Sequence, residues 1–164
     1  MTAVRTRIPL PPSMVVRELI EGLLGRDVTV SPGDPVMPRA GSPAAVAVFT
    51  DAHLQMRAVM VVDLPLAAAI GCALGLLPAG TVAECVQAGE LTEAVAENLH
   101  EVFNVASSSF NVGDAPHLTL YQVVSPGQMP PVDVSVMLRT LGRRLDLNVK
   151  VQGYGGGHIS VITS

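Results

Sequence analysis

The sequence predicts an α+β domain in which long helices pack on a largely antiparallel sheet. Three observations support this prediction. The segments follow the order helix, strands, helices, strands; the strand-like segments are joined by turns that favour hairpins; and 49% of the 164 residues are hydrophobic while only 15% are charged. Segregated helices and strands are typical of α+β folds. A chain of this length and hydrophobic content can bury a core of its own.

The N-terminal part is predicted to contain a lead, a helix and a strand. Residues 1–12 are expected to form a disordered lead, and residues 13–164 a single domain. Ser13 is a suitable N-cap for a helix to about Leu24, because a serine oxygen accepts a hydrogen bond from a free backbone N–H. Gly25 suits the end of this helix. A short strand over residues 27–30 follows.

A loop and a hairpin come next. Residues 31–43 are rich in proline and glycine and are predicted to be a loop. Residues 44–49 and 55–62 are two β-rich runs joined across residues 50–54, which predicts an antiparallel hairpin.

Two helices are predicted after this hairpin. Asp63 can cap the first, with Pro65 in its first turn, and the second covers residues 81–88 and ends at Gly89. The apolar run 64–77 is too short to cross a bilayer, which takes about 20 residues. No secretory signal is recognisable at the N-terminus. We therefore expect a cytoplasmic protein without a membrane partner.

The last third is predicted to consist mainly of strands. Strands are expected over residues 117–124 and 145–152, and helical spacing covers 132–141, although Val134 and Val136 also alternate as in a strand. The glycine-rich run 153–157 is predicted to be a hairpin turn leading to a final strand. A phosphate loop is disfavoured because no Lys-Ser/Thr pair follows the glycines, and a strand comes next instead of a helix.

A long amphipathic helix over residues 91–110 carries the most functional information. At about 100° per residue, its positions separate into an apolar and a polar side. The predicted apolar side consists of Val95, Leu99, Val102, Phe103, Ala106 and Phe110. The predicted polar side consists of Glu93, Glu97, His100, Glu101, Asn104 and Ser108.

Two details distinguish this polar side from an ordinary solvated helix face, which is the simpler interpretation. Asparagine is unfavourable inside a helix because its amide competes for backbone hydrogen bonds. No lysine or arginine occurs between Thr81 and Arg139, although a structural face would normally pair glutamate with a cation at i+4. An unpaired acidic face suits a partner that brings the positive charge.

Composition excludes several classes of function. The net charge is −4 and no basic face is visible, so no nucleic-acid partner is expected. The four histidines are scattered, and Cys72 and Cys85 do not form a CxxC pair. We therefore predict no metal site and two buried free thiols.

At the long helix the sequence resembles the CheC/CheX/FliY family of response-regulator phosphatases. The family signature is Asp or Ser, three residues, Glu, two residues and Asn, with a Pro a little over twenty residues later. Glu97, Glu101 and Asn104 match this spacing, and Ser108 stands at a usual glycine. Pro126 lies 22 residues after Asn104.

The resemblance extends in outline over residues 15–164, with one motif as in CheX. Two registers are open, because the family Pro usually precedes the valines of its strand, where this chain has Tyr121 and Gln122. A register of Glu93, Glu97 and His100 brings Tyr121 near the Pro position but replaces the Asn by His. We prefer the register that keeps Asn104. The helical segment 132–141 resembles an insertion.

The resemblance implies a mechanism and a partner. The helix would dock on the phosphorylated receiver domain of a CheY-like response regulator, where Asn104 would orient the hydrolytic water and Glu101 would pair with a receiver lysine. Docking contacts are expected from Glu97, His100, Ser108 and Pro126. The receiver would supply Mg²⁺, so no cofactor is expected on this chain.

Other roles stay open at this point. The chain would be a phosphatase of the receiver's aspartyl phosphate, or a non-catalytic receiver-binding or scaffolding relative with a degenerate motif. A third class is a subunit that assembles through its sheet edges, and a homodimer is a related expectation.

Overall fold

The computed structural model describes residues 7–164 and contains helices and strands in the predicted order. The first half has α1 (Ser13–Leu24), β1 (Val28–Pro32), β2 (Ala44–Thr50), β3 (Met56–Asp63) and α2 (Leu64–Leu74). The second half has α3 (Gly80–Ala88), α4 (Glu93–Ala106), the 3-10 helix η1 (Ser107–Ser109), β4 (Thr119–Val124), α5 (Val132–Leu138), β5 (Arg144–Val151) and β6 (Gly155–Thr163).

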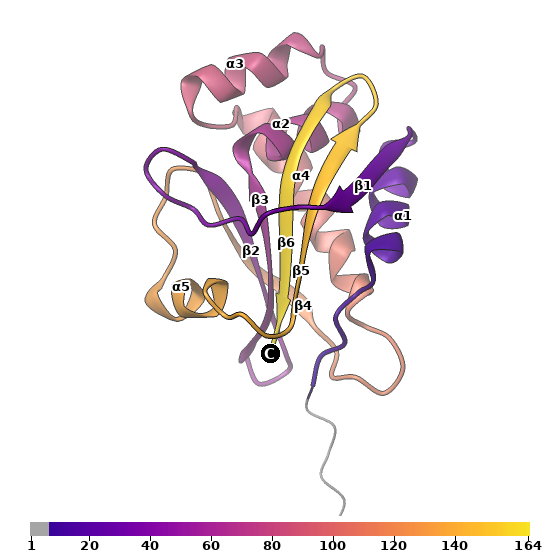
Figure 1. The fold of residues 1–164 in the computed structure, drawn as a ribbon, viewed down its shortest axis with the longest axis vertical. Coiled ribbons are helices and arrows are strands. Elements are labelled where there is room, and N and C mark those ends of the chain that lie inside the picture. The colour runs from indigo at the N-terminus through magenta and orange to yellow at the C-terminus, as the bar shows by residue number, and fades with distance from the viewer. Residues whose placement is uncertain (1–6) are drawn as a thin grey trace, which may run out of the picture.

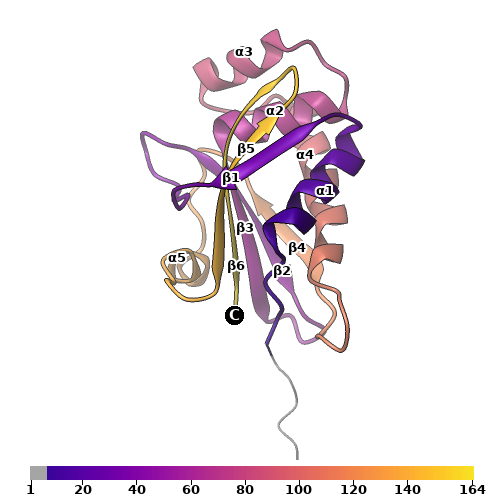
Figure 2. The same ribbon diagram turned by 45° about the vertical axis from the view of Figure 1, so that its right-hand side comes forward.

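The strands form one six-stranded sheet in the order β1-β5-β6-β3-β2-β4. Every neighbouring pair is antiparallel. Figures 1 and 2 show α1, α2 and α4 on one face of this sheet and α5 on the other. The predicted α+β architecture with helices on an antiparallel sheet is confirmed.

Strand β2 lies between β3 and the edge strand β4 and is buried along its whole length. Its alternate side chains Ala45, Ala47 and Phe49 pack with the helix layer. The intervening Ala44, Val46 and Val48 pack with α5. The segment that resembles an insertion therefore covers a second apolar face of the sheet, which explains why the first six residues of β2 are all apolar instead of every second one.

Local signals in the sequence set several element ends. The Asp63 carboxylate accepts a hydrogen bond from the Leu66 N–H at 3.1 Å and caps α2 as predicted. Gly25 ends α1 with φ of 66°, a conformation that glycine adopts without strain. At the start of α1, however, Pro12 is the N-cap and no side chain caps the helix.

The glycine-rich hairpin is tighter than predicted. Gly155 to Gly157 pair with Val151 to Val149 and belong to β6, so they are strand residues rather than turn residues. A Cβ on Gly156 would overlap the Val149 carbonyl oxygen. The glycines therefore let β5 and β6 approach closely at this end of the sheet.

The packed part of the chain begins before the predicted boundary at residue 13. Ile8 is completely buried in the main core, and the Arg143 guanidinium donates a hydrogen bond to its carbonyl oxygen at 2.7 Å. Residues 7–12 thus include a segment that packs on the domain, while residues 1–6 of the predicted lead lie outside the described residues.

The position of α4 is fixed by an unusually close approach to α2. Helix α2 contains four alanines and one glycine among its 11 residues, and a Cβ on Gly71 would lie only 2.6 Å from the Val95 carbonyl oxygen. The Asn98 amide nitrogen donates to the Gly71 carbonyl at 2.9 Å.

Within residues 7–164, no helix is both long and apolar enough to traverse a bilayer.

Replacing Gly71 by alanine should destabilise the protein by about 1–3 kcal/mol, because the added methyl must push α4 away from α2. Urea unfolding followed by circular dichroism measures this change. Gly22→Ala on α1 is the matched control, since nothing lies within 4 Å of a Cβ there. That variant should be neutral or more stable by up to about 1 kcal/mol. Equal destabilisation of both variants would contradict the close contact.

The turn between β2 and β3 is organised by the Asp51 carboxylate. It accepts hydrogen bonds from the backbone N–H groups of Gln55 at 3.0 Å and His53 at 2.9 Å, and Arg57 contacts it at 3.3 Å. The hydrogen bond from Gln55 is the largest cause that holds the pKa of Asp51 below its ordinary value of 3.8.

This lowered pKa predicts a specific dependence of stability on pH. The folded state binds the Asp51 proton less tightly than the unfolded chain, so its contribution is complete above about pH 4 and is lost as the pH falls through the folded-state pKa. The difference in unfolding free energy between the parent and Asp51→Asn should therefore shrink between pH 6 and pH 3. A constant difference over this range would show that Asp51 does not act through its charge.

Candidate functional site

The side of α4 that is buried in the structure is the side that the sequence predicts to be apolar. Its start is capped by the Thr92 hydroxyl, which accepts from the Val95 N–H at 3.3 Å. All six residues of the predicted apolar side are buried: Val95, Leu99, Val102, Phe103, Ala106 and Phe110. The Phe110 ring packs on Phe49 of β2 with ring centroids 5.1 Å apart. The helix is thus docked on the sheet through its apolar side.

The α-helix is shorter than predicted and ends at Ala106. The hydroxyls of Ser107 and Ser109 donate to the carbonyls of Asn104 and Ala106, each at 2.8 Å, and the chain tightens into η1. Serine side chains compete in this way for backbone hydrogen bonds. Ser108 therefore lies on a 3-10 turn rather than on the α-helix.

The predicted polar side faces solvent as a continuous row. Glu93, Glu97, His100, Glu101, Asn104 and Ser108 are all exposed. Within residues 7–164, the hydrogen bonds from side chains of this segment are made by other residues, chiefly Asn98, Ser107 and Ser109. The carboxylates and the Asn104 carboxamide are thus free to bind a partner.

The part of the chain that contains this row carries only negative charge. Residues 58–138, which run from β3 to the last residue of α5, contain no lysine or arginine. The eight acidic residues of this range are Asp63, Glu84, Glu90, Glu93, Glu97, Glu101, Asp114 and Asp133. A partner that docks on α4 can therefore supply the missing positive charge.

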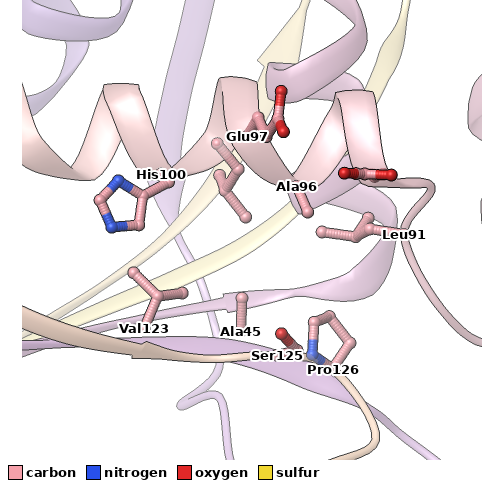
Figure 3. Close-up of a pocket in the computed structure, with 10 residues that line it drawn as sticks. Ala45, Leu91, Ala96, Glu97, His100, Val123, Ser125 and Pro126 are labelled. Atoms are coloured by element: carbon pink, nitrogen blue, oxygen red, sulfur yellow. The ribbon is translucent and has the colours of Figure 1, made fainter.

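A groove of about 350 Å³ runs between the first half of α4 and the end of β4. Figure 3 shows Leu91, Ala96 and His100 on one side of it and Ala45, Val123, Ser125 and Pro126 on the other. Glu93, Glu97 and Leu99 complete its lining. The groove brings together three of the predicted docking residues, Glu97, His100 and Pro126. Glu101, Asn104 and Ser108 are not among its lining residues and lie further along the chain.

The two candidates for the family proline position have different surroundings. Val48 of β2 pairs with Gln122 and Phe49 with Leu120, so Tyr121 is the extra residue of a β-bulge and is 59% exposed. Pro126 borders the groove that Glu97 and His100 also line. Asn104 is seven residues after Glu97, or about 10 Å along the helix axis.

Sequence reasoning predicted Pro126 but missed the other residues on the strand side of the groove, Ala45, Val123 and Ser125. It also missed the hydrogen bonds that close the loop after η1. The Asn111 side chain donates to the Leu118 carbonyl at 3.0 Å and accepts from the Leu118 N–H at 2.8 Å. This pair of bonds closes the loop between η1 and β4. The only local signal for it is an asparagine beside a glycine-containing turn, which is common to many loops.

Neither a reactive thiol nor a metal-binding cluster is found among residues 7–164. Both cysteines are free and buried, as predicted, and burial raises the pKa of the Cys72 thiol to about 11, which disfavours the reactive thiolate. Across residues 7–164 there is no cluster of three or more His, Cys, Asp or Glu side chains suited to hold a metal ion.

Comparison by sequence identifies no relative. No protein-family model matches the chain, and no curated protein matches it. Similarity appears at the level of three-dimensional structure.

Three solved structures illustrate this similarity. A chain of the FliM–SpeE complex from H. pylori has a TM-score of 0.59 at 10% identity, covering 90% of this chain and 79% of that chain. FliY from Thermotoga maritima has a TM-score of 0.50 at 16% identity, covering 90% and 81%. A chain of the CheX–CheY–BeF3–Mg²⁺ complex from Borrelia burgdorferi has a TM-score of 0.50 at 12% identity, covering 90% and 92%. The chain therefore has the CheC/CheX/FliM-like fold.

Proposed function

We propose that the protein docks α4 on the phosphorylated receiver domain of a CheY-like response regulator and promotes hydrolysis of its aspartyl phosphate. The observation that carries the proposal is the exposed pair Glu101 and Asn104, spaced as in the family motif on a helix whose opposite side is buried in the core. The fold is also that of a chain crystallised in a complex of CheX with CheY, BeF3 and Mg²⁺.

Asn104 would position the water that attacks phosphorus. A carboxamide can donate one hydrogen bond and accept another while staying neutral, so it can hold a water molecule without repelling the phosphoryl oxygens. The water oxygen forms a bond to phosphorus as the bond from phosphorus to the aspartyl oxygen breaks. The electron pair stays on the receiver carboxylate, and inorganic phosphate leaves with both protons of the water, one of which it can release to the solvent. Because this transition state is loose and in line, aligning the water is much of the task.

Glu101 would fix the complex by an ion pair with a receiver lysine. It lies three residues before Asn104 and therefore on the same side of α4. Glu97, His100 and Ser108 would extend the contact along the helix, and Pro126 would add a contact from the end of β4. The receiver would supply Mg²⁺, so this chain would contribute positioning and one negative charge.

A non-catalytic receiver-binding or scaffolding role is the second candidate. Two observations favour it: Pro126 borders the groove with Glu97 and His100, and Asn104 is not part of that lining; and a chain of the FliM–SpeE complex has a higher TM-score than the chain of the CheX–CheY complex. This role would use the same face of α4 without water alignment.

Assembly through the edge strands β1 and β4, including a homodimer, would show as a mass above 17.1 kDa in light scattering.

A dephosphorylation assay separates these roles. Receiver domains encoded in the same genome are phosphorylated with acetyl phosphate in the presence of Mg²⁺, freed of excess donor, and followed by release of inorganic phosphate with and without this protein. Faster release from at least one receiver supports the phosphatase. Binding of a phosphorylated receiver without faster release supports the scaffold. Absence of binding to every receiver would contradict both.

A further inference from the structure

The groove beside α4 combines an apolar interior with two acidic residues, Glu93 and Glu97, on its helix side. Its walls and floor include Leu91, Ala96 and Val123, and Figure 3 shows these side chains directed into the space between α4 and β4. At about 350 Å³, it lies at the small end of the range for ligand pockets, about 300–1,000 Å³. It is therefore suited to a single long side chain rather than to a large cofactor.

Two acidic residues, Glu93 and Glu97, belong to the helix side of the same groove. Figure 3 shows the Glu97 carboxylate on the outer side of α4 rather than in the space between α4 and β4. Both residues are exposed, and they are one helical turn apart, so their side chains can converge on one charged group. The Ser125 hydroxyl adds an acceptor from the strand side. Residues 58–138 of this chain, which include both glutamates, contain no Lys or Arg that could neutralise them.

We infer that this groove receives an arginine or lysine side chain of the docked partner. The alkyl stem of such a side chain packs on apolar surface while its cationic head stays near water, which matches apolar walls with carboxylates at their edge. Charge-assisted hydrogen bonds to carboxylates are stronger than neutral ones. A bound anion would be repelled by Glu93 and Glu97, and a purely apolar side chain would leave both carboxylates without a partner.

This inference rests on the proposed function, because the partner is taken to be the receiver that binds Glu101 and Asn104. It adds a second anchor at a defined place. The groove carboxylates precede Asn104 by seven and eleven residues on the same helix, which is about 10–17 Å along its axis. A matching receiver would therefore carry a basic side chain at about this distance from its phosphorylated aspartate.

The test uses the full chain and small probes that imitate the side chain. N-acetyl-L-arginine amide and N-acetyl-L-citrulline amide have the same length, but only the first carries a charge. Titration of each into isotope-labelled protein, followed by NMR, reports binding residue by residue. We expect the arginine probe to shift the signals of Ala45, Ala96 and Val123, and the citrulline probe to shift them little.

Variants locate the binding. The double variant Glu93→Gln/Glu97→Gln should weaken arginine binding about five- to tenfold, as expected for the loss of two exposed charge pairs. Ala96→Leu, which fills the groove, should abolish the shifts. The matched control Glu18→Gln/Glu84→Gln removes two exposed carboxylates from α1 and α3 and should leave binding unchanged. Equal binding of the two probes, equal loss in both double variants, or no shift at these residues would overturn the inference.

Failure of this inference can be told apart from failure of the proposed function. Glu101→Gln and Asn104→Ala lie outside the groove lining, so both should keep the arginine-induced shifts. If these variants change phosphate release but no probe enters the groove, the second anchor is wrong and the phosphatase stands. If the probe binds but no receiver is bound or dephosphorylated, the groove stands and its partner is a different basic protein.

Discussion

Replacing Asn104 by alanine is expected to slow dephosphorylation of the receiver by about a hundredfold or more, toward the rate of the receiver alone. The reason is geometric: loss of the carboxamide leaves the attacking water without its in-line orientation, and misplacement by about 1 Å can cost a factor of a hundred. Because Asn104 is exposed, stability should stay within about 0.5 kcal/mol of the parent. Release of inorganic phosphate at saturating protein measures the rate.

The control for this variant removes an equivalent group elsewhere. Gln87 is an exposed residue of α3 with the same carboxamide chemistry, and Gln87→Ala should dephosphorylate the receiver at the parent rate. Receiver binding by Asn104→Ala should persist, since Glu101 and Glu97 are intact. An Asn104→Ala variant that is folded and fully active would eliminate the proposed role of this residue.

Replacing Phe103 by alanine is expected to destabilise the protein by about 3–5 kcal/mol, the usual cost of truncating a buried phenylalanine. Its ring is 2% exposed and belongs to the main core between the helix layer and the sheet. Urea unfolding monitored by circular dichroism gives the free energy of unfolding. A loss of this size is a large part of the stability of a typical domain, about 5–15 kcal/mol.

A neighbouring exposed position tests the phase of the same helix. Glu101 is two residues before Phe103 and exposed, so Glu101→Ala should change the unfolding free energy by less than about 0.5 kcal/mol. Equal midpoints for Phe103→Ala and the parent would mean that the ring is not part of the core. The assignment of Glu101 and Asn104 to the outer side of α4 would then fail with it.

The phase of α4 could be predicted from the sequence because it depends on spacing alone. Val95, Leu99 and Phe103 recur at i+4 and fix the buried side, and the exposure of Glu101 and Asn104 follows from that. The cap at Asp63 was predictable for a similar reason, since an N-cap acts on backbone within three residues.

Other features depend on distant parts of the chain and were missed. The burial of Ile8 depends on a core formed by segments up to residue 161, and the placement of Gly156 in a strand depends on the approach of β5. The groove requires Ala45, Val123 and Leu91, from three separate segments, to meet. Periodicity within one segment carries no information about such meetings.

The contact between Gly71 and Val95 has a further consequence for recognition. Because α4 rests against the backbone of α2 and is tied to it by Asn98, its outer row has little freedom to shift or rotate. Binding to this row then requires the ordering of exposed side chains but not of a backbone segment of this chain. A few charged contacts can therefore give a useful affinity. Selectivity among partners then depends on how well the charges of each partner match the fixed spacing of the exposed residues on α4.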